Sequence, residues 1–182
     1  MQYYEAFGLE PKLALDLNDL QKRFYERSRQ WHPDKFSRAG AEEQQKALDM
    51  TAILNDAFRT LKNPVTRAEY FLKQKQVEFA KEAPTELLEE VFELNMALEE
   101  LREGDDSARG QLDAAREKFQ GLLTGIDAEL EELFALYDAS AAGAVLDTGA
   151  VLDKVGRGLN RRRYVSNLIR EVDKELNVHL SN

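Results

Sequence analysis

A proline at position 33 separates two segments of helical apolar periodicity, residues 17–31 and 41–62. Proline has no N–H to give to a helix, and it disfavours helical geometry at the residue before it. The chain is therefore expected to leave the first helix near Trp31, and the two amphipathic segments are expected to pack as an antiparallel pair. The tripeptide His32-Pro33-Asp34 then lies in the connection between two helices, where a rigid scaffold often carries functional residues.

The periodicity along the whole chain predicts an all-α protein of two domains. Leu, Ala, Glu and Lys/Arg are abundant while β-branched residues are sparse, which favours helices throughout. Residues 1–75 predict a helical hairpin with short flanking helices, the last of which begins at Asn63-Pro64. Residues 76–84 are predicted to be a linker. Residues 85–182 carry three long helical patterns with short connections, which predicts an antiparallel three-helix bundle.

Composition excludes several classes of function. Cysteine is absent, so disulfides, thiolate catalysis and cysteine-based metal or cluster sites are ruled out. His32 and His179 are the two imidazoles, and carboxylates alone are poor ligands for a transition metal. We therefore expect no bound metal or other cofactor. No basic, apolar N-terminal signal and no apolar run of about 20 residues is visible, so a cytoplasmic protein that does not enter a membrane is expected.

The net charge of −9 is unevenly distributed. Residues 1–75 hold 13 Lys/Arg and 11 Asp/Glu, a balance of +2, whereas residues 76–182 hold 12 and 23, a balance of −11. The two domains are therefore expected to meet different partners. A chain this acidic is a poor candidate for nucleic-acid binding. The run Arg161-Arg162-Arg163 is too short to change that expectation and is interpreted as a solvated helix face.

Three stretches of the first domain resemble a J-domain: residues 20–24, the run Trp31-His32-Pro33-Asp34-Lys35-Phe36, and residues 55–64. The Asp-Lys-Phe continuation and the later Arg67-Ala68-Glu69-Tyr70-Phe71-Leu72 are similar to the HscB type, the J-domain co-chaperones of iron–sulfur cluster assembly. The resemblance is strong over about the first 75 residues and looser over the rest.

This resemblance implies that the tripeptide and the basic face of the second helix dock on the ATPase unit of a DnaK/HscA-type heat-shock chaperone. It implies further that Asp34 pairs with an arginine of that chaperone. The implied chaperone-binding residues are His32, Pro33, Asp34, Lys35, Lys22, Arg23 and Arg29. General J-domains often carry basic residues where this chain has Tyr25 and Glu26, which predicts a narrower choice of chaperone.

The tripeptide has two other interpretations, a catalytic one and a purely structural one. Catalysis by His32 and Asp34 would need a nucleophile or a bound substrate, and the sequence offers no cysteine, no glycine-rich phosphate loop and no serine in a strand-to-helix turn. A purely structural role would limit both residues to capping helices. We therefore expect a protein that is not an enzyme.

The second domain offers a separate candidate site. Leu88, Phe92 and Met96 step by four, and they point away from the core seam of the same helix. Such an apolar row, rimmed by Glu89, Glu93 and Glu99, is typical of a partner-binding surface. The alternative is a wider core in which the last helix or the first domain covers the row.

In HscB-type proteins this helix holds the cluster scaffold protein, IscU, and the resemblance extends to several positions here. Leu88, Phe92 and Glu93 match the family's contact residues, whereas Met96 stands where the family often has Glu. On the last helix Arg163-Tyr164 matches an Arg-aromatic pair that also meets the scaffold, although Tyr164 could instead be a core-edge aromatic.

Together these features predict a co-chaperone that stimulates a DnaK/HscA-type ATPase and delivers an IscU-type scaffold to it. Two alternatives stay open: a J-domain co-chaperone with a different client, and a non-catalytic helical interaction protein in which the tripeptide is incidental.

Overall fold

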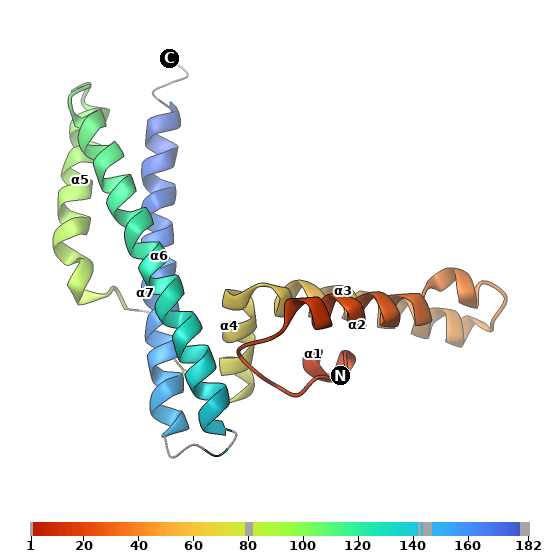
Figure 1. The fold of residues 1–182 in the computed structure, drawn as a ribbon. Helices are drawn as coiled ribbons and strands as arrows, with labels where there is room; N and C mark the ends of the chain where they lie inside the picture. Colours follow the sequence, from red (N-terminus) through yellow and green to blue (C-terminus); the bar gives the residue numbers. More distant parts are fainter. Residues whose placement is uncertain (1, 79–81, 142, 144–146, 179–182) are drawn as a thin grey trace. The chain divides into compact units, whose positions relative to one another are not determined.

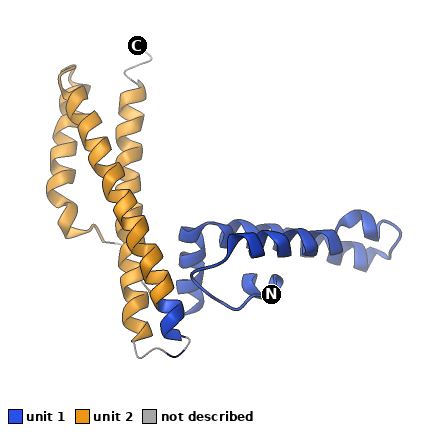
Figure 2. Ribbon diagram, viewed as in Figure 1, with its two compact units in different colours: residues 1–77, 137–146 blue, residues 78–136, 147–182 orange. Residues whose placement is uncertain are grey.

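The structure is a computed structural model that describes residues 2–78, 82–141, 143 and 147–178. These residues are helical with connecting turns, and none of them forms a strand. The chain divides into two compact units, residues 1–77 with 137–146 and residues 78–136 with 147–182 (Figure 2). The predicted all-α architecture, a helical hairpin with short flanking helices followed by a helical second domain, is confirmed.

The first unit is built around a helical hairpin. Its helices are α1 (Tyr3–Ala6), α2 (Leu17–Gln30), α3 (Ala41–Lys62), α4 (Pro64–Gln74) and the last turns of α6. Figure 1 shows α2 and α3 lying side by side, joined at one end by the connection that contains the turn Pro33–Phe36. Local chemistry explains these limits, because the Asp16 side chain accepts two backbone N–H groups to begin α2 and Asn63 does the same for α4.

Aromatic and leucine side chains fill the core of the first unit. Phe24 stacks on Phe58, which joins α2 to α3, and the edge of Tyr4 contacts Phe71 of α4. Leu20 is fully buried on the face that the periodicity predicts. Leu17, in contrast, is 45% exposed, because it occupies the first turn of α2 at the edge of the core.

The end of α6 belongs to the first unit, which sequence periodicity did not predict. The Asp138 carboxylate accepts the backbone N–H of Leu13 at 3.0 Å and that of Ala14 at 2.8 Å. The ring of Tyr137 lies edge-on to Phe71, with centroids 5.3 Å apart. The segment between α1 and α2 is therefore fixed by residues more than a hundred positions away.

The second unit contains three long helices. They are α5 (Leu88–Arg102), preceded by a 3₁₀ turn, Thr85–Leu87, then α6 (Ala108–Ala141) and α7 (Thr148–Val178). Leucines at helical spacing form the buried seam, as predicted, and include Leu94, Leu98 and Leu101 of α5. Ion pairs join the helices at the surface, for example Arg102 of α5 with Glu175 of α7 and Arg116 of α6 with Asp173 of α7.

Element limits differ in two places from those that the sequence predicts. The helix expected from residue 86 opens with the 3₁₀ turn Thr85–Leu87, in which Thr85 is the first residue and Pro84 stands at the cap position without a side-chain capping hydrogen bond. The helix α6 continues to Ala141, past the turn expected at residues 140–143, of which residue 142 lies outside the described residues. The linker at 76–84 stays a prediction, and residues 79–81 lie outside the described part, as does His179. No helix in the described ranges is both long and apolar enough to span a bilayer.

Candidate functional site

The His-Pro-Asp tripeptide forms a tight turn at the tip of the α2–α3 hairpin. Residues Pro33–Phe36 make one 3₁₀ turn within the predicted connection between α2 and α3. His32 caps this turn, since its Nδ1 accepts the Asp34 N–H at 3.3 Å, and Ser37 donates its hydroxyl to the Asp34 carbonyl oxygen at 2.9 Å. The backbone of Asp34 is therefore fixed at both ends while its side chain is 91% exposed.

This geometry suits recognition better than catalysis. The Asp34 carboxylate lies 3.6 Å from the imidazole of His32, but both side chains are largely exposed to water. A base-and-orienter pair would need a nucleophile beside it and exclusion of water. Within the described ranges no group of three acidic or imidazole side chains is placed to hold a metal ion either. The turn presents an exposed carboxylate to solvent.

An aromatic stack holds the turn against α3. The rings of Trp31 and Phe36 are nearly parallel with centroids 5.9 Å apart, and the Lys46 ammonium lies 5.8 Å from the Trp31 centroid. The Thr51 hydroxyl of α3 donates to the Trp31 carbonyl oxygen at 3.1 Å. The sequence alone did not indicate that Lys46 and Thr51 contact Trp31. These contacts depend on which face of α3 lies against the turn.

The basic residues predicted to bind the chaperone fall into two groups. Lys22, Arg29 and Lys35 are exposed and can reach a partner. Arg23 is different, because its guanidinium donates to the Asp19 carboxylate at 2.8 Å and to the carbonyl oxygens of Phe7 and Gly8, both at 3.2 Å. Arg23 thus ties α1 to α2, and its assignment to chaperone binding stays a prediction.

The apolar row on α5 is open to solvent. Leu88, Phe92 and Met96 are 56%, 65% and 49% exposed, and neighbouring Glu93 is exposed as well. Within the second unit no helix covers the row, so the wider-core alternative does not hold inside this unit. We call Leu88, Phe92 and Met96 the α5 ridge below.

The Arg-aromatic pair lies on α7. Arg163 is exposed, its guanidinium carbon lies 6.0 Å from the Tyr164 ring centroid, and it donates to the Asn160 side-chain oxygen at 2.8 Å. Asn160 in turn donates to the Glu82 carbonyl oxygen at 2.8 Å, in the segment that leads into α5. The pair is thus one turn from a contact with the beginning of the α5 region, while Tyr164 is half-buried.

The arginine run that contains Arg163 is not the solvated face that the sequence suggested. Arg161 pairs with Glu86 and with Glu129, and Arg162 pairs with Asp127. These ion pairs connect α7 to the beginning of the α5 region and to α6. Two of the three arginines therefore stabilise the packing of the second unit through ion pairs with acidic residues on the neighbouring elements.

Each half of the chain matches a known protein family. The sequence matches the DnaJ domain family over residues 2–70 and the HSCB C-terminal oligomerisation domain over residues 83–173. The co-chaperone protein HscB homolog of Neisseria meningitidis serogroup C is 35% identical over 161 residues, covering 85% of this chain and 94% of that protein. The homolog from Vibrio vulnificus is 37% identical over 139 residues, covering 72% and 81%.

Solved structures agree as well. Chaperone HscB from Vibrio cholerae superposes with a TM-score of 0.68 at 26% identity over 99% of both chains. Human co-chaperone protein HscB shares the fold, with a TM-score of 0.65 at 20% identity over 96% of this chain and 82% of that one. The curated relatives bear the name of a co-chaperone rather than of an enzyme. Since both domain families match in order and the relatives align over most of their length, the chain belongs to the HscB family of J-domain co-chaperones.

Proposed function

We propose that this protein stimulates the ATPase of a DnaK/HscA-type chaperone through its hairpin tip and delivers an IscU-type iron–sulfur scaffold protein that its second unit holds. One observation carries the proposal: each unit exposes a surface suited to a protein partner. The first presents the Asp34 carboxylate, and the second presents the α5 ridge. Family membership supports the proposed identity of the two partners.

The chaperone half rests on electrostatics at the tip. An arginine of the chaperone that reaches Asp34 would form a charge-assisted hydrogen bond, worth about 1.5–3 kcal/mol. Lys22, Arg29 and Lys35 are exposed at the rim, where positive charges mainly steer the encounter with an acidic surface. Because the backbone of the turn is already fixed, less conformational entropy is lost when the chaperone binds.

The scaffold half rests on the ridge. Exposed leucine, phenylalanine and methionine side chains on one stripe of a helix are costly to leave in water and are typical anchors for a partner. The exposed Glu93 beside them adds a negative charge, which favours apolar partners that carry a complementary positive charge. Binding both partners on one chain raises the effective concentration of the scaffold at the chaperone.

The test measures ATP turnover of a DnaK/HscA-type chaperone with the full-length protein, and in parallel titrates an IscU-type scaffold by calorimetry. Asp34→Asn should abolish stimulation of the ATPase and leave scaffold affinity unchanged. The control is Asp49→Asn, at an exposed position of α3, and this variant should stimulate the ATPase normally. Changing Leu88, Phe92 and Met96 together to Ala should weaken scaffold binding by about 3 kcal/mol, on the order of 100-fold. The control Leu48→Ala, an exposed leucine of α3, should not.

The two arms have separate consequences. Full stimulation by folded Asp34→Asn would refute the role of the tip. Scaffold affinity unaffected by the triple change would refute the role of the ridge. A wild-type protein that stimulates the ATPase but does not bind the scaffold would leave a J-domain co-chaperone for a different client.

A further inference from the structure

A buried polar side chain joins α7 to residues 82–87, which lead into α5 and which we call the entry segment. Asn160 of α7 is 6% exposed, and its side-chain amide donates to the Glu82 carbonyl oxygen at 2.8 Å. A buried amide needs such a partner, because leaving it unpaired would cost free energy. The hydrogen bond therefore holds the first residue of the entry segment against α7.

The rest of the entry segment is held in other ways. The side chains of Pro84 and Leu87 are buried, and Glu86 forms its ion pair with α7 at 3.3 Å. The side chains of Glu82 and Ala83, in contrast, are exposed. Anchoring of these first two residues is therefore expected to depend on the amide hydrogen bond, whereas the later residues have apolar and ionic contacts of their own.

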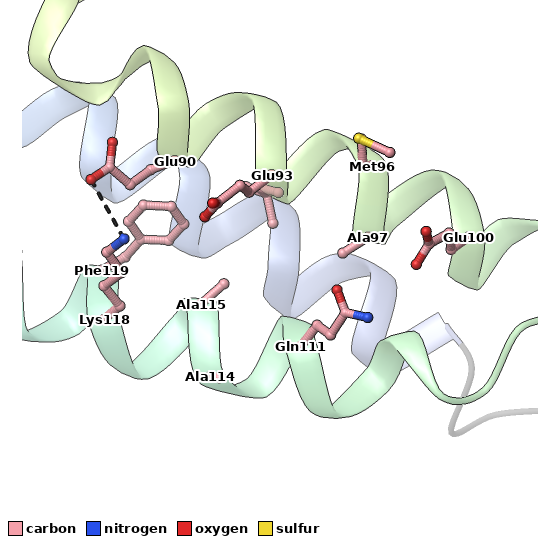
Figure 3. Close-up of a pocket in the computed structure, with 11 residues that line it drawn as sticks. Glu90, Glu93, Met96, Ala97, Glu100, Gln111, Ala114, Ala115, Lys118 and Phe119 are labelled. Carbon is pink, nitrogen blue, oxygen red and sulfur yellow. Dashed lines mark ion pairs between the residues drawn. The ribbon is translucent and has the colours of Figure 1, made fainter.

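The helix α5 itself is held by contacts that do not involve Asn160. A groove of about 530 Å³ lies between α5 and α6 beside the α5 ridge (Figure 3), and Leu94 and Phe119 are buried at its floor. Across this groove Glu90 pairs with Lys118 at 3.5 Å. We therefore expect α5 to keep its place when the Asn160 hydrogen bonds are removed, so that only the beginning of the entry segment is released.

The other end of the Asn160 amide is occupied as well. Its oxygen accepts a hydrogen bond from Arg163 Nη2 at 2.8 Å, one turn along α7. The two partners determine how the amide is oriented, because the Glu82 carbonyl oxygen can only accept and a guanidinium can only donate. Asparagine suits this position for that reason. An ionised aspartate would accept from Arg163 but could not donate to Glu82, and leucine would do neither.

Arg163 is the exposed member of the Arg-aromatic pair that is predicted to bind the scaffold. A guanidinium carries five N–H donors in one plane, so Arg163 can keep its bond to Asn160 and offer other donors to a partner. Because Asn160 orients the side chain beforehand, less conformational entropy is lost when a partner binds. A partner that fixes Arg163 also fixes the amide, which favours the hydrogen bond to Glu82.

From these contacts we infer that Asn160 couples scaffold binding at Arg163 to the anchoring of Glu82 and Ala83. A bound scaffold strengthens the anchor, and the anchor strengthens scaffold binding by the same factor, as thermodynamic linkage requires. Asn160 is thus a positioning residue that acts through Arg163, and the inference rests on the proposed scaffold-binding role of the second unit. The entry segment follows the first unit along the chain, so the coupling makes the start of their connection depend on whether the scaffold is bound.

The test places one spin label on the entry segment of the full-length protein. The chain has no cysteine, so Ala83→Cys at an exposed position carries a single nitroxide. Electron paramagnetic resonance measures the mobile fraction of the label with and without an IscU-type scaffold, and calorimetry measures scaffold affinity. With Asn160 in place, the mobile fraction should fall about fivefold when the scaffold binds, at the lower end of known couplings between sites.

Two substitutions of Asn160 separate the two hydrogen bonds. Asn160→Leu keeps the branched shape but removes both bonds, so the label should be mobile with and without the scaffold and affinity should fall about fivefold. Asn160→Asp keeps the acceptor for Arg163 and loses the donor to Glu82, so the scaffold should no longer change the mobility of the label. The control Asn167→Leu, at an exposed asparagine of α7, should behave as the wild type does. Circular dichroism checks that each variant is folded.

The outcomes separate this inference from the proposed function. If the scaffold binds and immobilises the label equally in the wild type and in Asn160→Asp, it acts on the entry segment directly, so the coupling is wrong and the scaffold role stands. If the label in free Asn160→Leu is as immobile as in the wild type, Asn160 does not anchor the segment and the inference is again wrong. If the wild type does not bind the scaffold, both fail.

Discussion

At the residue scale, the function proposed for the tip depends on how firmly one exposed carboxylate is positioned. The Asp34 carboxylate is largely exposed, with the His32 imidazole 3.6 Å away, and its position comes mainly from the backbone turn and the aromatic stack beside it. Phe36 therefore acts at a distance, because its ring supports Trp31, and Trp31 is bonded to α3 through its carbonyl oxygen.

Phe36→Ala should loosen the tip without unfolding the hairpin, since Phe36 lies outside α2 and α3. We expect ATPase stimulation to fall several-fold, mainly through a higher concentration for half-maximal effect. Trp31 is the single tryptophan of the chain, so its fluorescence reports on the stack directly. In Phe36→Ala the fluorescence emission of Trp31 should shift to longer wavelength and be quenched more readily by solutes, because the ring is more exposed to water. Phe36→Tyr keeps the ring and should behave as the wild type does. Full stimulation together with a red-shifted Trp31 would mean that the stack does not position Asp34.

A second residue-scale prediction concerns pH. Burial raises the pKa of Tyr4 above its ordinary value of 10.0, against the opposing effect of the Arg67 cation. The folded state thus keeps the Tyr4 proton at a pH where the unfolded chain releases it, so stability is complete below pH 10 and falls as pH rises beyond it. The slope contributed is at most about 1.4 kcal/mol per pH unit.

Urea unfolding between pH 8 and about 11.5 measures this slope. Tyr4→Phe should be less stable at pH 8 by about 1 kcal/mol, because the hydroxyl no longer donates to the Lys12 carbonyl oxygen. The variant should also lose stability less steeply above pH 10. Some slope should remain, since burial raises the pKa of Tyr137 as well. Equal slopes for the two proteins would contradict the assignment to Tyr4.

At the element scale, the packing of α6 against α7 depends on one glycine. A methyl group at the buried Gly158 would meet Leu130 Cδ2 at 2.8 Å and Leu130 Cγ at 3.4 Å. Leu130 is itself buried, so it cannot simply swing into solvent. Gly158→Ala should therefore destabilise the second unit by about 1–3 kcal/mol despite its better helix propensity. Chemical denaturation followed by circular dichroism measures the change.

Gly125→Ala on α6 is the matched control. A methyl group there meets nothing within 4 Å, so only helix propensity acts and the variant should be more stable by up to about 1 kcal/mol. Combining Gly158→Ala with Leu130→Ala should recover part of the loss if the clash is the cause. A stabilising Gly158→Ala would show that the two helices separate at little cost.

The sequence predicted the structure correctly where neighbouring residues along the chain determine it. The limits of α4 follow from Asn63 and Pro64, and the exposure of the α5 ridge follows from its phase along one helix. It was wrong about Arg161, which was expected on a solvated face but pairs with Glu86 and Glu129 of the same unit. It also did not indicate that Arg23 donates to two carbonyl oxygens of its own unit. The groove beside the ridge was also missed, because its volume depends on the separation of two helices.

At the scale of the whole molecule, the contact that no local pattern could predict is the one made by Asp138. Two backbone N–H groups that belong to no helix, those of Leu13 and Ala14, would lack their acceptors without it. The buried Arg67 donates to the Leu13 carbonyl oxygen at 2.7 Å, so this segment is bonded on both sides. The stability of the first unit is therefore expected to depend on a residue near the end of α6.

Asp138→Ala should destabilise the first unit by about 1.5–3 kcal/mol, because two charge-assisted hydrogen bonds are lost. Hydrogen exchange resolved by residue measures it: the amides of Leu13 and Ala14 should lose protection, whereas amides in α5 should not. Glu132→Gln, an exposed carboxylate nearby on α6, is the control and should change neither. Removing residues 78–182 should expose the same two amides and uncover Phe71, making a J-domain fragment less stable than the same residues in the full chain. Unchanged protection in Asp138→Ala would mean that the segment holds its conformation through Arg67 and the Tyr4 hydroxyl alone.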